Sequence, residues 1–136
     1  MNINYNEIKI GDRLVRNKGG IFSKHHALYV GFWNNQHLVA ENQIDVGVRY
    51  IPLNQFLDEG ILERIDYNNF NENSQTIIID RVNKKIGTSY ILTNYNCEHF
   101  VNEILLGVAE SKQVKNAIAL GVGVSLCLFA FLRTKE

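Results

Sequence analysis

The stretch that decides how this chain is interpreted is Asn94-Tyr95-Asn96-Cys97-Glu98-His99-Phe100-Val101-Asn102-Glu103-Ile104-Leu105-Leu106-Gly107. Its apolar side chains and its cysteine recur at i, i+3, i+4, i+7 and i+8, at Cys97, Phe100, Val101, Ile104 and Leu105. This spacing is typical of the buried face of an amphipathic helix. Asn96 is a suitable N-cap and Gly107 a suitable end. We therefore predict a helix between them, with Cys97 in its first turn and facing a sheet.

Cys97 is a candidate nucleophile because of this position. The positive end of a helix dipole lowers the pKa of a thiol and favours the reactive thiolate. A cysteine on an apolar helix face is also commonly a small buried hydrophobic residue. The spacing alone leaves both roles open. His25 is a candidate base, since a thiol nucleophile needs an imidazole within hydrogen-bond reach and a polar group that orients it.

A zinc site built from the cysteine and three of the histidines is a further alternative. It would use His25, His37, Cys97 and His99. Residues two apart on a helix point about 200° away from each other, so Cys97 and His99 cannot both bind one ion. The spacing disfavours zinc and predicts a structural role for His99. No cofactor is expected.

Residues 1–111 are predicted to form one α+β domain. Alternating apolar residues indicate strands over 7–16, 26–33, 36–42, 46–53 and 61–67. Asn34-Asn35 is a good hairpin turn between the second and third of these. Asn54 is expected to cap a short helix that ends at Gly60, and Ser74 a longer helix that runs to about Ile86.

The composition excludes several classes of protein. The 136 residues carry 14 Lys and Arg against 14 Asp and Glu, and a balanced charge argues against a nucleic-acid partner. A hydrophobic share of 46% excludes disorder. Two cysteines, Cys97 and Cys127, are too few for a disulfide framework and fit a reducing compartment. The N-terminal residues lack the features of a signal peptide, so we expect an intracellular protein.

Residues 112–136 are predicted to anchor the chain in a membrane. No charged residue occurs from 116 to 132, and basic residues flank this run on both sides. Seventeen residues form a helix of roughly 25 Å, which is the lower limit for crossing a bilayer core. A buried C-terminal helix is the alternative. On the anchor interpretation the lipid bilayer is a partner through residues 116–132, and the catalytic domain lies on the cytoplasmic side.

Four stretches resemble one known family. Asn96-Cys97-Glu98-His99-Phe100 is similar to the Asn-Cys-Glu-His-Phe signature of the lecithin:retinol acyltransferase-like family, and most of all to the HRAS-like suppressor phospholipase/acyltransferases. Ile10–Leu14 is similar to the first strand of that family. His25–Gly31 is similar to its His-x-x-x-Tyr-x-Gly strand. Ser111–Lys115, leading into the apolar run, resembles the start of its membrane anchor.

The resemblance implies a circularly permuted papain-like (NlpC/P60-type) fold, with an antiparallel sheet packed on the helix that bears the cysteine. It implies acyl transfer from a membrane phospholipid through a thioester on Cys97, with His25 as the base. The products are those of a phospholipase A or of an acyltransferase. Two alternatives are a cysteine peptidase or amidase of the same fold, and a membrane-tethered interaction module without activity.

This sequence departs from the family at two places. The family usually has an aromatic residue after the first histidine, where His26 stands here, and the spacing to Tyr29 selects His25 rather than His26 as the base. The second departure concerns the third catalytic residue. The family commonly has a histidine twelve positions after the first, and His37 stands there. With the turn at Asn34-Asn35, however, residue 27 lies opposite residue 41, and Glu41 lies diagonal to His25 on the same face. His37 is then about 10 Å or more away along the hairpin. A carboxylate also orients an imidazole well. We therefore prefer Glu41, with His37 as the alternative and Asn42 after it.

Overall fold

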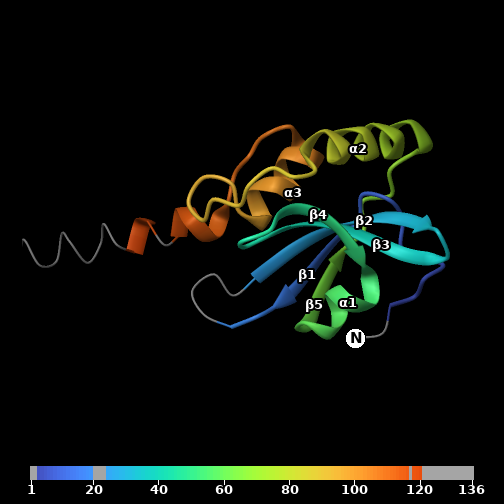
Figure 1. Ribbon diagram of the computed structural model, residues 1–136, viewed down its shortest axis with the longest axis horizontal. Coiled ribbons are helices and arrows are strands. Elements are labelled where there is room, and N and C mark those ends of the chain that lie inside the picture. Colours follow the sequence, from blue (N-terminus) through green and yellow to red (C-terminus); the bar gives the residue numbers. More distant parts are fainter. Residues whose placement is uncertain (1–2, 20–23, 117, 121–136) are drawn as a thin grey trace, which may run out of the picture.

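The computed structural model describes residues 3–19, 24–116 and 118–120. Five strands form one antiparallel sheet in the order β4-β3-β2-β1-β5. The elements follow one another as β1 (Arg13–Asn17), β2 (Lys24–Trp33), β3 (Gln36–Gln43), β4 (Gly47–Pro52), α1 (Leu53–Asp58), β5 (Ile61–Asp66), α2 (Glu72–Lys85) and α3 (Cys97–Leu106). Helices α2 and α3 lie over one side of the sheet, and α1 lies on the other (Figure 1). The predicted α+β class with a sheet packed on the cysteine helix is confirmed.

Each face of the sheet has its own apolar core, because side chains alternate along the strands. On one face Leu28, Val30 and Ala40 pack against α2 and α3. Val82 of α2 and Phe100 of α3 are part of this core. On the other face the neighbouring strand residues pack against α1 and the N-terminal segment. These are Leu14, Ala27, Tyr29, Val39 and Ile51, which contact Ile8, Leu53 and Phe56. The two cores hold β2 and β3 rigidly in the middle of the domain.

The β2–β3 hairpin has the register that the Asn34-Asn35 turn predicts. Both asparagines have positive φ angles, 48° and 63°, as a two-residue hairpin turn requires. Ala27 therefore lies opposite Glu41. The register shifts once, between Tyr29 and Gly31.

Helix α3 begins and ends where the sequence predicts. The side chain of Asn96 accepts hydrogen bonds from the backbone N–H groups of Glu98 (2.9 Å) and His99 (3.1 Å). His99 completes the cap, because its Nδ1 accepts the backbone N–H of Asn96 at 3.2 Å. Gly107 ends the helix with a φ of 76°. The predicted structural role of His99 is confirmed.

Three predicted boundaries are wrong. The first strand begins at Arg13 and not at residue 7, because Asp12 accepts the backbone N–H groups of Lys9 and Asn68 and turns the chain. Helix α2 is capped by Asn71, with Ser74 already inside it as a donor. Helix α1 begins directly after Pro52, without any side-chain cap from Asn54.

The C-terminal prediction falls mostly outside the described residues. Residues 112–116 and 118–120 are helical, and Val114 is buried against the domain. Of the apolar run over 116–132, residue 117 and residues 121–132 are not described. Within the part of the chain that the structure describes, no helix combines the length and the apolar character needed to cross a membrane.

Candidate active site

Three side chains from three elements meet at the end of the sheet where β2 begins. Cys97 is the first residue of α3, His25 the second residue of β2, and Glu41 lies in the second half of β3. His25 Nε2 and Glu41 Oε2 are 2.6 Å apart. All three side chains are almost completely buried, with exposed fractions of 2%, 1% and 0%. In a cysteine-dependent enzyme the thiol is the nucleophile, the imidazole is the base and the carboxylate orients the imidazole, and this site contains all three groups.

The Cys97 thiol lies against the first residues of β2. Its Sγ donates to the backbone carbonyl oxygen of Lys24 at 3.7 Å. Glu41 occupies Nε2 of His25, so Nδ1 is the ring nitrogen that remains for the thiol, and within the described part of the chain Nδ1 forms no hydrogen bond. The side chains of His25 and Cys97 are close enough to shift each other's pKa.

The three pKa shifts point to one charge distribution. Burial by itself would raise the pKa of the Cys97 thiol, but His25 and the backbone N–H of His26 lower it overall. Burial would lower the pKa of His25, but Cys97 and Glu41 raise it overall. The pKa of Glu41 is lowered by His25 and Arg49 against the effect of burial. The arrangement therefore favours a thiolate beside an imidazolium, which is held by a carboxylate.

The comparisons with known proteins identify the family of the chain. Residues 8–119 match the model of a family described as permuted papain-like amidase enzymes of the YaeF/YiiX, C92 type. The chain belongs to this permuted papain-like family. It is also 30% identical to phospholipase A and acyltransferase 3 of Pongo abelii, over 85% of this chain and 86% of that protein. The corresponding mouse protein, from Mus musculus, is 32% identical over 76% of each chain.

A further relative extends the same similarity. Phospholipase A and acyltransferase 2 of Homo sapiens is 29% identical over 90% of this chain and 85% of that protein. The resemblance seen in the Asn-Cys-Glu-His-Phe stretch and the permuted papain-like fold that it implies are confirmed. Membership in this family also makes the chain part of a family of enzymes.

The permuted papain-like site includes one residue that the sequence analysis missed. Arg49 lies directly opposite Glu41 in the β3–β4 pairing. Its Nε and Nη2 donate to Glu41 Oε1 at 3.0 and 2.8 Å, so the other carboxylate oxygen is left for His25. The sequence feature that could have revealed Arg49 is its charge, which is opposite to that of Glu41 on the neighbouring strand of the next hairpin. Finding it required the β3–β4 register, in which Gln43 pairs with Gly47.

The alternative third residues lie elsewhere. The Nδ1 of His37 is bonded to the hydroxyl of Tyr29 at 2.7 Å, and the His37 ring contacts Tyr5 and Phe32. His37 and Glu41 are four positions apart along β3, a distance of about 13 Å. Asn42 points to the other side of β3, where its amide donates to the carbonyl oxygen of Tyr95 at 2.8 Å. Of the three candidates, the structure brings only Glu41 to His25.

His26 has an environment different from that of its neighbour. Adjacent residues of a strand point to opposite faces, so His26 faces away from Glu41. Burial lowers the pKa of His26 to about 4, which makes it a neutral side chain near pH 7. Within the described ranges, 3–19, 24–116 and 118–120, no cluster of His, Cys, Asp and Glu is large enough to hold a metal ion.

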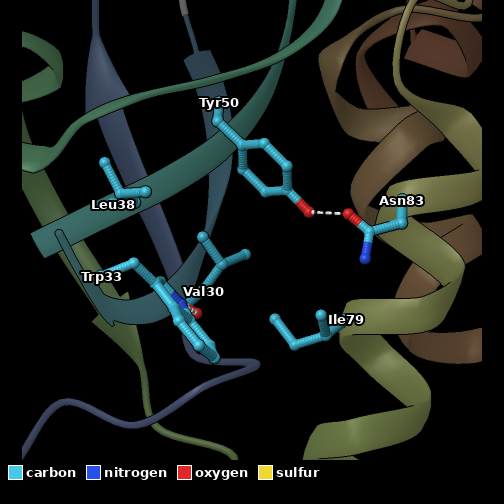
Figure 2. A pocket seen from close by; sticks show the side chains of 6 residues that line it. All are labelled: Val30, Trp33, Leu38, Tyr50, Ile79 and Asn83. Carbon is cyan, nitrogen blue, oxygen red and sulfur yellow. Dashed lines mark hydrogen bonds between the residues drawn. The ribbon is translucent and has the colours of Figure 1, made fainter.

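A separate apolar pocket lies at the opposite end of β2, between the sheet and α2 (Figure 2). It has a volume of about 250 Å³ and is lined by Val30, Trp33, Leu38, Tyr50, Ile79 and Asn83. The hydroxyl of Tyr50 donates to Asn83 at one side of it. Val30 is five residues along the strand from His25, about 16 Å away. This pocket is therefore remote from the thiol.

Proposed function

We propose that this chain is a thiol-dependent acyl hydrolase and acyltransferase that acts on membrane glycerophospholipids. The observation that carries the proposal is the Cys97–His25–Glu41 arrangement in a chain related over most of its length to proteins named phospholipase A and acyltransferase. The similarity to these relatives supplies the substrate class. The buried thiol, with its lowered pKa, supplies the nucleophile.

In the proposed first step, the Cys97 thiolate attacks the carbonyl carbon of a fatty-acyl ester. The backbone N–H of Cys97, at the start of α3, then donates to the oxyanion that develops. As the C–O bond breaks, His25 gives its proton to the leaving alcohol, which departs as a lysophospholipid. The acyl group remains on Cys97 as a thioester.

In the proposed second step, His25 takes a proton from the acceptor as it attacks the thioester. Water as acceptor releases a fatty acid and restores the thiol, which is phospholipase A activity. A lipid amine or alcohol as acceptor forms an amide or a new ester, which is acyltransferase activity. Glu41 holds the His25 ring through both steps and stabilises its charged form.

The experiment that tests this proposal uses the purified full-length chain and phosphatidylcholine vesicles. After brief incubation and acid quenching, mass spectrometry should find one fatty-acyl group on the peptide that contains Cys97. Lysophosphatidylcholine and fatty acid should form in equal amounts in the absence of another acceptor. A Cys97→Ser variant is the matched control, because it keeps the shape of the site but has a weak nucleophile. Lysolipid formation without any adduct in the wild type would contradict the thioester mechanism.

An amidase acting on small amides is the second candidate, because the matching family is described by that activity. The same thioester chemistry cleaves an amide when His25 protonates the leaving amine. Assays with acyl anilides or short peptides alongside the phospholipid separate the two. Turnover of amides with no phospholipid hydrolysis would favour the amidase.

Membrane attachment through residues 116–132 is a further part of the proposal, with the catalytic domain facing the cytoplasm. The support is the charge-free run of seventeen residues with flanking basic residues. The full-length chain should pellet with vesicles and stay bound at high salt, because apolar burial is not screened as charge attraction is. Replacing Leu126 and Leu128 by Asp costs about 2.5–3.5 kcal/mol each at the centre of a span and should release the protein. Release by salt alone would contradict an inserted anchor.

A further inference from the structure

The short segment that follows α3 returns to the active site and holds the main chain of Lys24. The backbone N–H of Lys24 donates to Gln113 Oε1 at 3.1 Å, and Gln113 Nε2 donates to the carbonyl oxygen of Lys24 at 3.2 Å. One carboxamide thus occupies both hydrogen-bonding groups of this residue, as a neighbouring strand would. Lys24 directly precedes His25.

The carbonyl oxygen of Lys24 also accepts a hydrogen bond from the Cys97 thiol. Sγ of Cys97 and Nε2 of Gln113 both donate to the oxygen of Lys24, at 3.7 and 3.2 Å. The peptide group between Lys24 and His25 is therefore shared by three parts of the molecule: the start of β2, the first turn of α3 and the segment around Gln113. Its position sets where the His25 side chain leaves the strand and where the thiol rests.

The segment around Gln113 is also hydrogen-bonded to α3. Glu98, next to the nucleophile, accepts Ser111 Oγ at 2.7 Å and the backbone N–H of Gln113 at 3.1 Å. These bonds hold the pKa of Glu98 below its usual range although burial would raise it. Ser111 and Val114 are themselves buried. Gln113 is thus fixed by its backbone to the helix of Cys97 and by its side chain to the strand of His25.

We propose that Gln113 is a positioning residue of the active site, which fixes the Lys24 peptide and through it the alignment of the Cys97 thiol with His25. The inference rests on the proposed thiol chemistry of Cys97 and His25. It places the segment 111–114 inside the catalytic unit, although sequence analysis put the domain boundary at residue 111. Misplacement of a reacting group by about 1 Å can cost roughly 100-fold in rate, so a clamp at this peptide has a kinetic effect.

The test compares three variants of the full-length chain. Gln113→Ala removes both bonds to Lys24. Gln113→Glu keeps an oxygen that accepts the Lys24 N–H, but it loses the donor to the Lys24 carbonyl oxygen and adds a negative charge near the thiolate. Lys112→Ala is the matched control, because Lys112 is an exposed neighbour in the same turn. The rate of Cys97 alkylation by iodoacetamide is measured against pH, together with the thermal midpoint and lipid turnover.

In the wild type, alkylation should rise with pH around a midpoint below that of a free thiol, about 8.5. Gln113→Ala should move this midpoint upward by about half to one pH unit, because the Lys24 carbonyl oxygen, without the bond from Gln113, accepts more strongly from the protonated thiol. It should also lower kcat/KM by about tenfold. Gln113→Glu should shift the midpoint at least as far, and Lys112→Ala should leave it unchanged.

Two results would overturn the role of Gln113. One is a folded Gln113→Ala protein with a lower thermal midpoint but an unchanged alkylation profile, since Gln113 would then be structural only. The other is an unchanged alkylation profile in Gln113→Glu. Iodoacetamide reads the thiol without any lipid, so a wild-type chain that fails to hydrolyse phospholipid leaves this result standing. The failure of the lipid proposal and the failure of the Gln113 proposal are therefore distinguishable.

Discussion

Glu41→Gln is the substitution that tests the site most directly. It keeps the shape of the side chain and removes its charge. Glu41 is fully buried, and its two oxygens are divided between His25 at 2.6 Å and Arg49 at 2.8 and 3.0 Å. An amide has one oxygen for these two donors. Its NH₂ group must therefore face either the His25 ring or the Arg49 guanidinium, where it meets another donor.

The expected loss of rate follows from the contact that is broken. A hydrogen bond to a charged group contributes about 1.5–3 kcal/mol, and 3 kcal/mol corresponds to roughly 150-fold in rate. An amide that stabilises the wrong tautomer of the histidine raises the loss to about 10⁴-fold. We therefore expect kcat to fall by about 10- to 10⁴-fold. The pH at which Cys97 becomes alkylated should rise as well, because the imidazolium that stabilises the thiolate is itself less stable.

The assay is phosphatidylcholine hydrolysis by full-length protein in mixed micelles, with circular dichroism as the check on folding. His37→Ala is the matched comparison, since His37 is the alternative third residue and lies about 13 Å along β3 from Glu41. Its activity should stay within about threefold of the wild type. A crippled His37→Ala beside a nearly active Glu41→Gln would refute the assignment of Glu41 and the importance of the 2.6 Å contact.

Four further substitutions test the remaining parts of the site. Cys97→Ala should abolish both the acyl adduct and lipid turnover with an unchanged circular dichroism spectrum, and residual turnover would rule out Cys97 as the nucleophile. His25→Ala should lose activity by a similar factor, whereas His26→Ala should keep most of it because His26 faces the other side of the sheet; kinetic assays giving the reverse order would contradict the register of β2. Glu41 has a lowered pKa, so its contribution to stability is present above its ordinary value near 4.5 and is lost as the pH falls. Arg49→Met should reduce this acid sensitivity in urea unfolding between about pH 3 and pH 7, and an identical pH dependence would show that Arg49 does not act on Glu41.

The sequence predicts the parts of this site that depend on local chemistry. The cap at Asn96, the end at Gly107 and the apolar face between them fix Cys97 at the start of α3. The paired asparagines at 34 and 35 fix the hairpin, and the hairpin brings Glu41 to His25. In each case a few neighbouring residues determine the geometry, so the local sequence pattern is sufficient to predict the element and its position.

The parts that the sequence does not predict depend on contacts between distant segments. Arg49 reaches Glu41 only through the register of a second hairpin, whose turn carries no strong dipeptide signal. Gln113 reaches Lys24 across 89 positions of the chain, and nothing in the residues around it indicates a partner. The N-terminal strand was predicted too long for a similar reason, since Asp12 forms a bond to Asn68, 56 positions away, and ends the alternation.

The departure from the family's usual third histidine has a structural cause in the hairpin. With the turn at Asn34-Asn35, residue 37 pairs with Phe32 near the tip, far from the start of β2. The polar group that meets His25 must then come from the part of β3 opposite residue 27, and Glu41 is the residue there. A carboxylate in so buried a place requires a counter-charge, since an unpaired buried charge is costly. Arg49 supplies that charge from the next strand.

Because Arg49 compensates the charge of Glu41, the two residues should act together. A Glu41→His variant should therefore have a higher activity when Arg49 is also replaced by an uncharged residue than when Arg49 is retained. Double-mutant kinetics would show this as a positive coupling between the two positions, and simple additivity would contradict it.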